Sequence, residues 1–260
     1  MPLILPVKLT LDVTKSLEKN AEHYYELSKK AKRKIDSVKR IIAETEQKLE
    51  KLDAHEQKKQ EKVPQRKRQW YEKFRWFITS DGFLVLGGRD ATTNEIVIKK
   101  HMDDKDLVFH TDMAGSPFFV LKTEGKEPTA ASLQECADAT CTFSRAWKLN
   151  MGAQSVFYVH PDQISKQANP GEYLTKGAFM IRGKTNYIDN NVNCAIGAAE
   201  DGAIMCGPVE AIKTHCAKAV VVRQGQLKPS DAAKKIQKRI GGMIDDIIRA
   251  LPSGNFELAQ

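Results

Sequence analysis

The chain has 260 residues, of which 41% are hydrophobic, and this is enough for one large or two small domains with a buried core. No apolar run approaches the roughly 20 residues that a membrane span needs, and the first residues lack the cleavage site of a signal peptide. The five cysteines are scattered and form no CxxC pair, which is typical of reduced thiols in a cytoplasmic protein.

The net charge of +8 is concentrated in the first part of the chain. Residues 1–75 hold 20 Lys or Arg and 12 Asp or Glu, so the 21 basic and 21 acidic side chains of the remainder cancel. The first 75 residues also contain no glycine. This composition predicts a basic arm over residues 1–75 and a second, glycine-rich domain over residues 76–260.

The arm is predicted to be helical, because apolar or small residues recur at alternating steps of four and three. Five such repeats predict a coiled-coil helix, and Thr14 is the expected N-cap. The members of the stripe are Leu17, Ala21, Tyr24, Ser28, Ala31, Ile35, Val38, Ile42, Thr45, Leu49 and Leu52.

A second basic helix is predicted over residues 65–77, because Pro64 suits a helix start. It is expected to return antiparallel to the first helix and to dock on the second domain through Trp70, Tyr71, Phe74, Trp76 and Phe77. This returning helix is shorter than the first. Part of the apolar stripe therefore needs another partner: a second copy of the chain, the domain itself, or a further segment.

The second domain alternates short strand patterns with turns. Asp81–Gly82 lies between two apolar runs and predicts a β-hairpin. One central helix is predicted from Ser132, with Glu135 as its capping-box partner, and a C-terminal helix follows Pro229, broken at Gly241–Gly242. The fold class is therefore α+β with a mainly antiparallel sheet. The other strands are predicted at residues 95–101, 107–111, 118–124, 155–160, 178–184, 193–199, 203–207 and 219–225.

No motif predicts a catalytic or cofactor-binding centre. The histidines lack the close spacing of zinc ligands, the cysteines lie in apolar runs, and no glycine-rich phosphate loop occurs. Neither a metal nor a cofactor is expected. Basic and aromatic residues at turns remain, and they either contact RNA phosphates and bases or only solvate a β-surface. They are Arg89, Lys99, Lys100, His110, Lys166, Lys176, Arg182, Lys184 and Tyr187.

Arg182 and Lys184 form the most specific of these predictions. On a strand, their two-residue spacing would place both on one face with Met180, and Phe179 and Ile181 would point toward the core. The two cations would repel each other unless an acid, such as Asp90 or Glu172, or an RNA phosphate lay beside them.

Several long stretches resemble the C-terminal half of the NFACT family of ribosome quality-control factors. They are "YYELSKKAKRKI", "WYEKFRWFITSDGFLVLGGRDATTNEIVIKK", "DLVFHTDMAGSPFFVLK" and "GEYLTKGAFMIRGKTNY". The family includes the eukaryotic nuclear export mediator factor, the bacterial RqcH and fibronectin-binding-protein-like members, and archaeal relatives. Residues 1–75 resemble its middle coiled coil, and residues 76–260 resemble its RNA-binding NFACT-R domain.

The resemblance implies a non-catalytic protein that binds tRNA and the rRNA of large ribosomal subunits carrying stalled nascent chains. It also implies that the basic residues named above face RNA, and a homodimer through the coiled coil is a further expectation. The family's N-terminal domain and helix-hairpin-helix segment have no counterpart in these residues. A fragment of a longer factor or a stand-alone relative is therefore expected. The alternative function is an RNA-acting enzyme, or an accessory to RNA modification, with His110, Asp112 and Arg182 in a cleft.

Overall fold

The computed structural model describes residues 9–60, 66–168, 171 and 173–259, and within the first of these ranges it describes side chains up to residue 49. The chain forms two compact units, Met1–Gln65 and Arg66–Gln260. This division falls a little before the boundary that composition predicts near Arg75.

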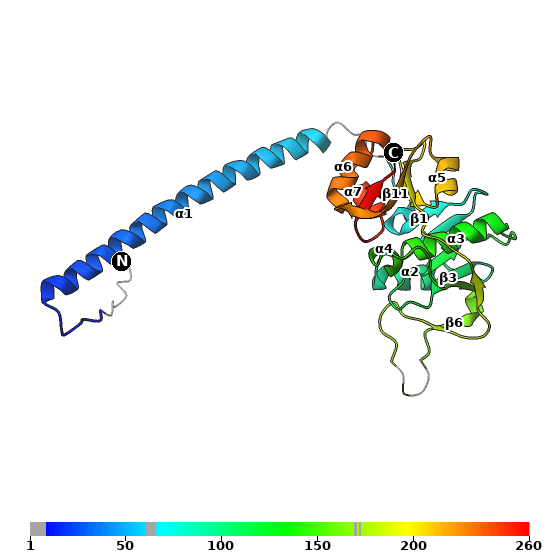
Figure 1. Ribbon diagram of the computed structural model, residues 1–260, viewed down its shortest axis with the longest axis horizontal. Coiled ribbons are helices and arrows are strands. Elements are labelled where there is room, and N and C mark those ends of the chain that lie inside the picture. Colours follow the sequence, from blue (N-terminus) through cyan, green and yellow to red (C-terminus); the bar gives the residue numbers. More distant parts are fainter. Residues whose placement is uncertain (1–8, 61–65, 169–170, 172, 260) are drawn as a thin grey trace. The chain divides into compact units, whose positions relative to one another are not determined.

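The first unit is built on one long helix, α1 (Leu17–Gln60), which is drawn in blue in Figure 1. Ser16 precedes the helix, and its hydroxyl accepts a hydrogen bond from the Lys19 N–H at 3.4 Å. Thr14, the predicted N-cap, instead donates its hydroxyl to Asp12 at 2.5 Å. The predicted cap was therefore wrong, because Asp12 holds the Thr14 hydroxyl in a turn ahead of the helix.

The apolar stripe of α1 is exposed in this chain. Ile35, Val38 and Leu49 are each 54% exposed, and Ile42 is 50% exposed. Leu52 lies outside the residues whose side chains are described. A heptad stripe with this much exposed surface is typical of a coiled-coil helix seen without its partner.

The returning helix predicted for residues 65–77 is not formed in the part of that segment that the structure describes. Residues 66–69 have no regular structure, Trp70–Lys73 form one turn of 3-10 helix, and Arg75–Ile78 are strand β1. Phe74, Trp76 and Phe77 are buried in the core of the second unit. The prediction of a helical hairpin was therefore wrong. Residues 75–78 instead pair with the next strand, which buries Trp76 and Phe77 on opposite faces of β1, beside the buried Phe74.

A six-stranded antiparallel sheet forms the first half of the second unit. The predicted hairpin is confirmed, since β1 pairs with β2 around Gly82, whose φ of 92° suits glycine. The strands, in the order of the sheet, are β1 (Arg75–Ile78), β2 (Leu84–Gly87), β4 (Phe119–Leu121), β3 (Leu107–Thr111), β5 (Val156–Val159) and β8 (Asn186–Ile188).

The central helix packs on this sheet, and a short helix follows it. Helix α3 (Ala130–Thr142) contacts β3, β4 and β5, and α4 (Arg145–Lys148) follows it (Figure 1). The central helix is therefore confirmed, but Thr129 rather than Ser132 caps it, accepting from the Ser132 N–H at 3.1 Å. Glu135 accepts instead from the Ser80 N–H at 2.9 Å.

Residues 95–101, predicted as a strand, belong to helix α2 (Ala91–His101). Asp90 accepts a hydrogen bond from the Thr93 N–H at 2.8 Å, and the Thr93 hydroxyl accepts from the Asp90 N–H at 2.9 Å. This reciprocal cap fixes the start of the helix. Val97 and Ile98 are then buried together, so tertiary packing overrides the strand preference of the β-branched run.

A four-stranded antiparallel sheet forms the second half of this unit, and a short strand pair lies apart from both sheets. β1 lies against β10, where the Ile78 N–H contacts the Met205 sulfur at 3.3 Å. The remaining strands are β10 (Ile204–Gly207), β9 (Ala195–Ala198), β11 (Lys218–Leu227), β12 (Phe256–Leu258), and the pair β6 (Ile164–Ser165) and β7 (Met180–Ile181).

Three helices complete the second unit. The unpredicted α5 (Val209–His215) packs on β9 and β10, α6 (Pro229–Ile240) packs on β11, and α7 (Ile244–Ala250) packs on α6 and β10. The predicted break at Gly241–Gly242 is confirmed, because both glycines have a φ of 80°. The α+β class with antiparallel sheets is also confirmed. Among the described residues, no helix is long and apolar enough to cross a membrane.

Candidate nucleic-acid interface

A cavity of about 490 Å³ lies in the second unit, between segments that are distant in the sequence. Its walls are the residues after β2 with the start of α2 (88–91), the turn between β3 and β4 (114–118), the residues at α4 (143–148), and the loop 175–179. A volume of this size is sufficient for a small organic ligand.

Cationic side chains outnumber acidic ones in the lining of this cavity. Among the described residues, five Lys or Arg side chains line it against one carboxylate, that of Asp90. The five cations are Arg75, Arg89, Arg145, Lys148 and Lys176. The cavity therefore favours an anionic ligand.

Arg75 is the most enclosed of the five cations, with 9% of its surface exposed. Its Nη1 donates to the Leu251 carbonyl at 3.0 Å, and its guanidinium carbon lies 4.6 Å from the centre of the Phe143 ring. Burial lowers the pKa of Arg75 to about 10, so the side chain stays charged at neutral pH. It forms no ion pair with a carboxylate among the described residues.

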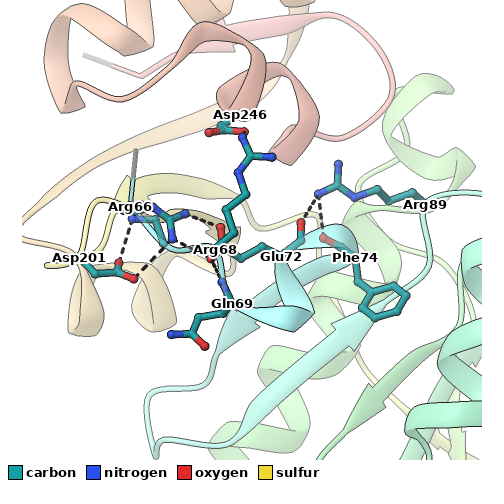
Figure 2. Close-up of polar contacts among 9 residues, drawn as sticks. Arg66, Arg68, Gln69, Glu72, Phe74, Arg89, Asp201 and Asp246 are labelled. Atoms are coloured by element: carbon teal, nitrogen blue, oxygen red, sulfur yellow. Dashed lines mark hydrogen bonds and ion pairs between the residues drawn. The ribbon is translucent and has the colours of Figure 1, made fainter. Parts of the chain in front are cut away.

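Arg89 is held in place by main-chain carbonyl groups (Figure 2). Its Nη1 donates to the Arg249 carbonyl at 2.8 Å, and its Nη2 donates to the carbonyls of Phe74 at 2.7 Å and Glu72 at 3.4 Å. Burial, and then repulsion from Arg75 and Arg249, lower the pKa of Arg89 to about 10. The guanidinium groups of Arg75 and Arg249 therefore disfavour the charged form of Arg89.

A set of ion pairs holds residues 66–72, which lead into β1, against the second unit, and we call this set the linker network (Figure 2). Arg66 pairs with Glu72 through both nitrogens of its fork and approaches Asp201 at 3.6 Å. Arg68 pairs with Asp246 at 2.8 Å. Burial alone would raise the pKa of Glu72, but its bonds to Arg66 and to the Gln69 N–H hold this pKa below its ordinary value.

The loop 175–179 is held against α2. Gly177 has a φ of 79°, and a Cβ at this position would lie 2.6 Å from the main chain of Ala91. Its N–H donates to Glu95 at 3.2 Å, and the Lys166 ammonium donates to two carbonyls of the loop at 3.1 and 2.8 Å. These contacts position Lys176 at the cavity.

Three of the nine predicted RNA contacts line this cavity, namely Arg89, His110 and Lys176. Lys166 lies beside them, and its ammonium is 4.8 Å from the centre of the Phe179 ring. Their contact with RNA stays a prediction.

Lys99, Lys100 and Tyr187 lie outside the cavity lining. Lys99 pairs with Glu95 at 2.6 Å, and Lys100 is exposed near the end of α2. The Tyr187 hydroxyl donates to the Asp112 carboxylate at 3.2 Å, and the tyrosine is 60% exposed. Tyr187 therefore offers a ring face for base stacking, which stays a prediction.

Arg182 and Lys184 do not share a strand face, because β7 ends at Ile181 and Gly183 adopts a φ of 84°. That part of the prediction was wrong, since the left-handed glycine turns the chain out of the strand. Arg182 donates to the Gln167 carbonyl at 3.1 Å, and both cationic residues are exposed. Their contact with RNA stays a prediction.

The neighbours proposed for this pair have other positions. Asp90 caps α2, and Glu172 lies outside the described residues. Phe179 packs edge-on against Phe118, with 5.6 Å between ring centres, and Ile181 contacts the core. The predicted inward direction of Phe179 and Ile181 is therefore confirmed.

Sequence reasoning missed Arg75, Arg145 and Lys148. Arg145 and Lys148 are one helical turn apart, after Ser144, whose hydroxyl accepts from the Ala146 N–H at 3.0 Å. This capped, basic turn was a usable signal. Arg75 gave no such signal, because it lies in a segment whose aromatics suggested the end of a helix.

His110 is expected to make folding sensitive to mild acid. Burial lowers its pKa, its Nε2 lies 3.2 Å from the Ser116 carbonyl, and its ring stacks on Phe118 at 4.1 Å. In the unfolded chain a histidine is protonated near pH 6.5, whereas His110 in the folded protein is protonated only at a lower pH. Stability is therefore fully present above that pH and is lost as the pH falls toward the folded pKa, by roughly 1.4 kcal/mol per unit of pKa difference.

Urea unfolding of the wild type and His110→Gln between pH 7.5 and pH 5 measures this effect. The wild type is expected to lose stability more steeply below pH 6.5 than the variant, and His160→Gln, at an exposed site, is expected to follow the wild type. Parallel curves for the wild type and His110→Gln would contradict the prediction.

The protein thus has a long helix followed by an α+β domain, and this domain contains a cavity lined by five cations. Residues 73–183 match the NFACT protein RNA binding domain, and residues 5–69 match the NFACT N-terminal and middle domains. The chain belongs to the NFACT family, as its sequence motifs indicate.

Relatives named for ribosome quality control resemble this chain over about two thirds or more of its length. It is 41% identical to the archaeal Rqc2 homolog aRqcH of Methanocaldococcus jannaschii, over 75% of this chain and 30% of that protein. It is 35% identical to the ribosome quality control complex subunit NEMF of Mus musculus, over 65% of this chain and 16% of that protein. The chain thus spans less than a third of the length of these relatives.

The chain also matches a solved structure weakly. It is the C-terminal part of the fibronectin/fibrinogen-binding protein of Streptococcus suis, with a TM-score of 0.39 and 20% identity over 50% of this chain and 48% of that chain.

Proposed function

We propose that this chain is a non-catalytic RNA-binding module of a ribosome quality-control factor. In this proposal it contacts tRNA and the rRNA of large ribosomal subunits that carry stalled nascent chains, and it works in the cytoplasm. The proposal is supported by the RNA-binding domain that residues 73–183 match and by relatives named as ribosome quality control subunits.

The observation that carries the proposal is the charge of the cavity. Its five cations against one carboxylate are a stronger positive bias than that of the whole Arg66–Gln260 unit, which holds 26 Lys or Arg and 22 Asp or Glu. Cations gathered in this way are used to contact phosphates.

The alternative, an RNA-acting enzyme, would need a free acid or base in the cavity. His110 lines the cavity, but its Nε2 contacts the Ser116 carbonyl at 3.2 Å. Asp112 accepts from the Tyr187 hydroxyl at 3.2 Å. These contacts favour binding over catalysis.

The basic arm is proposed to add electrostatic affinity for RNA, and its exposed stripe is proposed to pair with the stripe of a second copy. Each neutralised phosphate adds roughly 0.7 to 0.9 to the slope of log affinity against log salt. Fluorescence anisotropy with labelled tRNA, titrated at several salt concentrations, measures this slope. The full chain is expected to show a steeper slope than the Arg66–Gln260 unit.

Light scattering on the same samples gives the mass and is expected to show a dimer of the full chain. Failure of the full chain to bind tRNA, large subunits or single-stranded RNA at low salt would contradict the proposed function. Equal slopes for the full chain and the Arg66–Gln260 unit would instead show that the arm is a spacer.

A further inference from the structure

Among the described residues, two guanidinium groups at the cavity, those of Arg75 and Arg89, form no ion pair with a carboxylate. Arg75 is 9% exposed and donates to the Leu251 carbonyl, and Arg89 donates to three main-chain carbonyls. A buried charge is costly unless it is paired. Repulsion from Arg75 adds to burial in lowering the pKa of Arg89. An anion bound between them would relieve both effects.

The nearest acids are already engaged. The Asp90 carboxylate caps α2, with the Thr93 N–H at 2.8 Å and the Thr93 hydroxyl at 3.0 Å. Asp246, on α7, pairs with Arg68 at 2.8 Å. Neither carboxylate forms an ion pair with Arg75 or Arg89 among the described residues. Both acids favour the charged form of Arg89 through space, but neither pairs with it directly.

The outer part of the cavity is also positively charged. Arg145, Lys148 and Lys176 are exposed lining residues, and none of them forms an ion pair among the described residues. A ligand is therefore attracted at the rim and meets more enclosed cations further in.

The size and lining of the cavity limit the ligand. About 490 Å³ is far more than one phosphate group fills. The remaining wall combines the aromatic residues Phe118 and Phe179 with the polar residues Asn94 and Ser253. An apolar wall with a few polar groups, next to the two cations Arg75 and Arg89, suits a nucleoside attached to a phosphate.

We propose that this cavity binds one nucleotide unit, with its phosphate between Arg75 and Arg89 and its nucleoside toward the loop 175–179. This inference rests on the proposed function and deepens it, since the unit would be an unpaired nucleotide of an RNA chain. A free mononucleotide presents the same chemistry.

The test measures three ligands on the full chain. Isothermal titration with inorganic phosphate, with uridine monophosphate and with a short single-stranded oligouridylate reports affinity, and a thermal melt with each ligand reports stabilisation. The variants are Arg75→Met and the exposed pair Arg145→Met with Lys148→Met. Lys126→Met removes one exposed cation outside the cavity and is the control that matches Arg75→Met in charge.

Arg75→Met is expected to weaken uridine monophosphate and oligouridylate binding by about tenfold or more, as loss of a charged hydrogen-bonding partner does. The rim pair is expected to weaken both by about threefold to tenfold. Lys126→Met is expected to change neither by more than about twofold. If Arg75→Met does not fold, the rim pair decides, because exposed residues are not needed for the core.

Unchanged affinity of both cavity variants for both nucleotide ligands would overturn the inference, and RNA binding by the full chain would leave the proposed function standing. If oligouridylate displaces the mononucleotide, the ligand is an RNA chain. If the mononucleotide binds in the cavity but no RNA does, the nucleotide site is supported and its ligand is a free mononucleotide. The proposed function then fails.

Discussion

Replacing Trp147 with alanine is expected to lower the free energy of unfolding by about 3–5 kcal/mol. Trp147 is 2% exposed, and its ring centre lies 5.5 Å from that of Phe256. Its indole N–H donates to the Asn255 carbonyl at 3.0 Å. The substitution therefore leaves a large cavity and an unpaired carbonyl together.

The measurement is urea unfolding followed by circular dichroism. Trp70→Ala is the matched control, because Trp70 is 49% exposed although it stacks on His101 at 4.6 Å. This control is expected to cost less than about 1 kcal/mol. Equal losses for the two tryptophans would show that Trp147 is not packed as described. Because Trp147 lies between Arg145 and Lys148 in α4, the variant is also expected to weaken RNA binding.

Replacing Lys122 with methionine is expected to cost about 3–5 kcal/mol, because it leaves a buried carboxylate unpaired. Lys122 pairs with Asp106, whose side chain is 2% exposed, and its ammonium also donates to the His101 carbonyl at 2.9 Å. Asp106 further accepts from the Thr123 N–H at 3.0 Å. This cluster joins the start of β3 to the end of β4, at the opposite end of the strand pair from the turn that lines the cavity.

A second substitution separates the charge from the packing. In the Lys122→Met background, Asp106→Asn is expected to restore part of the lost stability, because the unpaired charge is then absent. Lys99→Met is the control, since Lys99 and Glu95 pair at 2.6 Å with Lys99 half exposed, and it is expected to cost less than about 1 kcal/mol. A further loss in the double variant would contradict this account.

Short sequence motifs correctly predicted the features that depend on local turn geometry. Asp81–Gly82 predicted the β1–β2 hairpin, and Gly241–Gly242 predicted the break before α7. The failures lie where local and tertiary preferences compete. The β-branched run after Asp90 is helical because of its cap, and the aromatics after Gln69 enter a strand because the core accepts them.

The cavity could be predicted only in part, for a geometric reason. Arg89, His110 and Lys176 lie at turns, where basic and polar residues indicate a binding surface. Arg75 and Arg145 meet them only because β1 and α4 pack beside those turns. The spacing of these residues along the chain does not indicate that they meet, so their common position at the cavity becomes visible only in the folded protein.

The linker network also has a mechanical consequence. Any tension carried along the chain from α1 reaches Arg66 and Arg68 before it reaches β1, and their carboxylate partners lie on the β9–β10 turn and on α7. The load is thus shared between two parts of the second unit that are distant in the sequence. The partly exposed pairs Arg66–Asp201 and Arg68–Asp246 contribute only about 0–1 kcal/mol each, so we expect these two contacts to open and re-form while the six-stranded sheet stays intact.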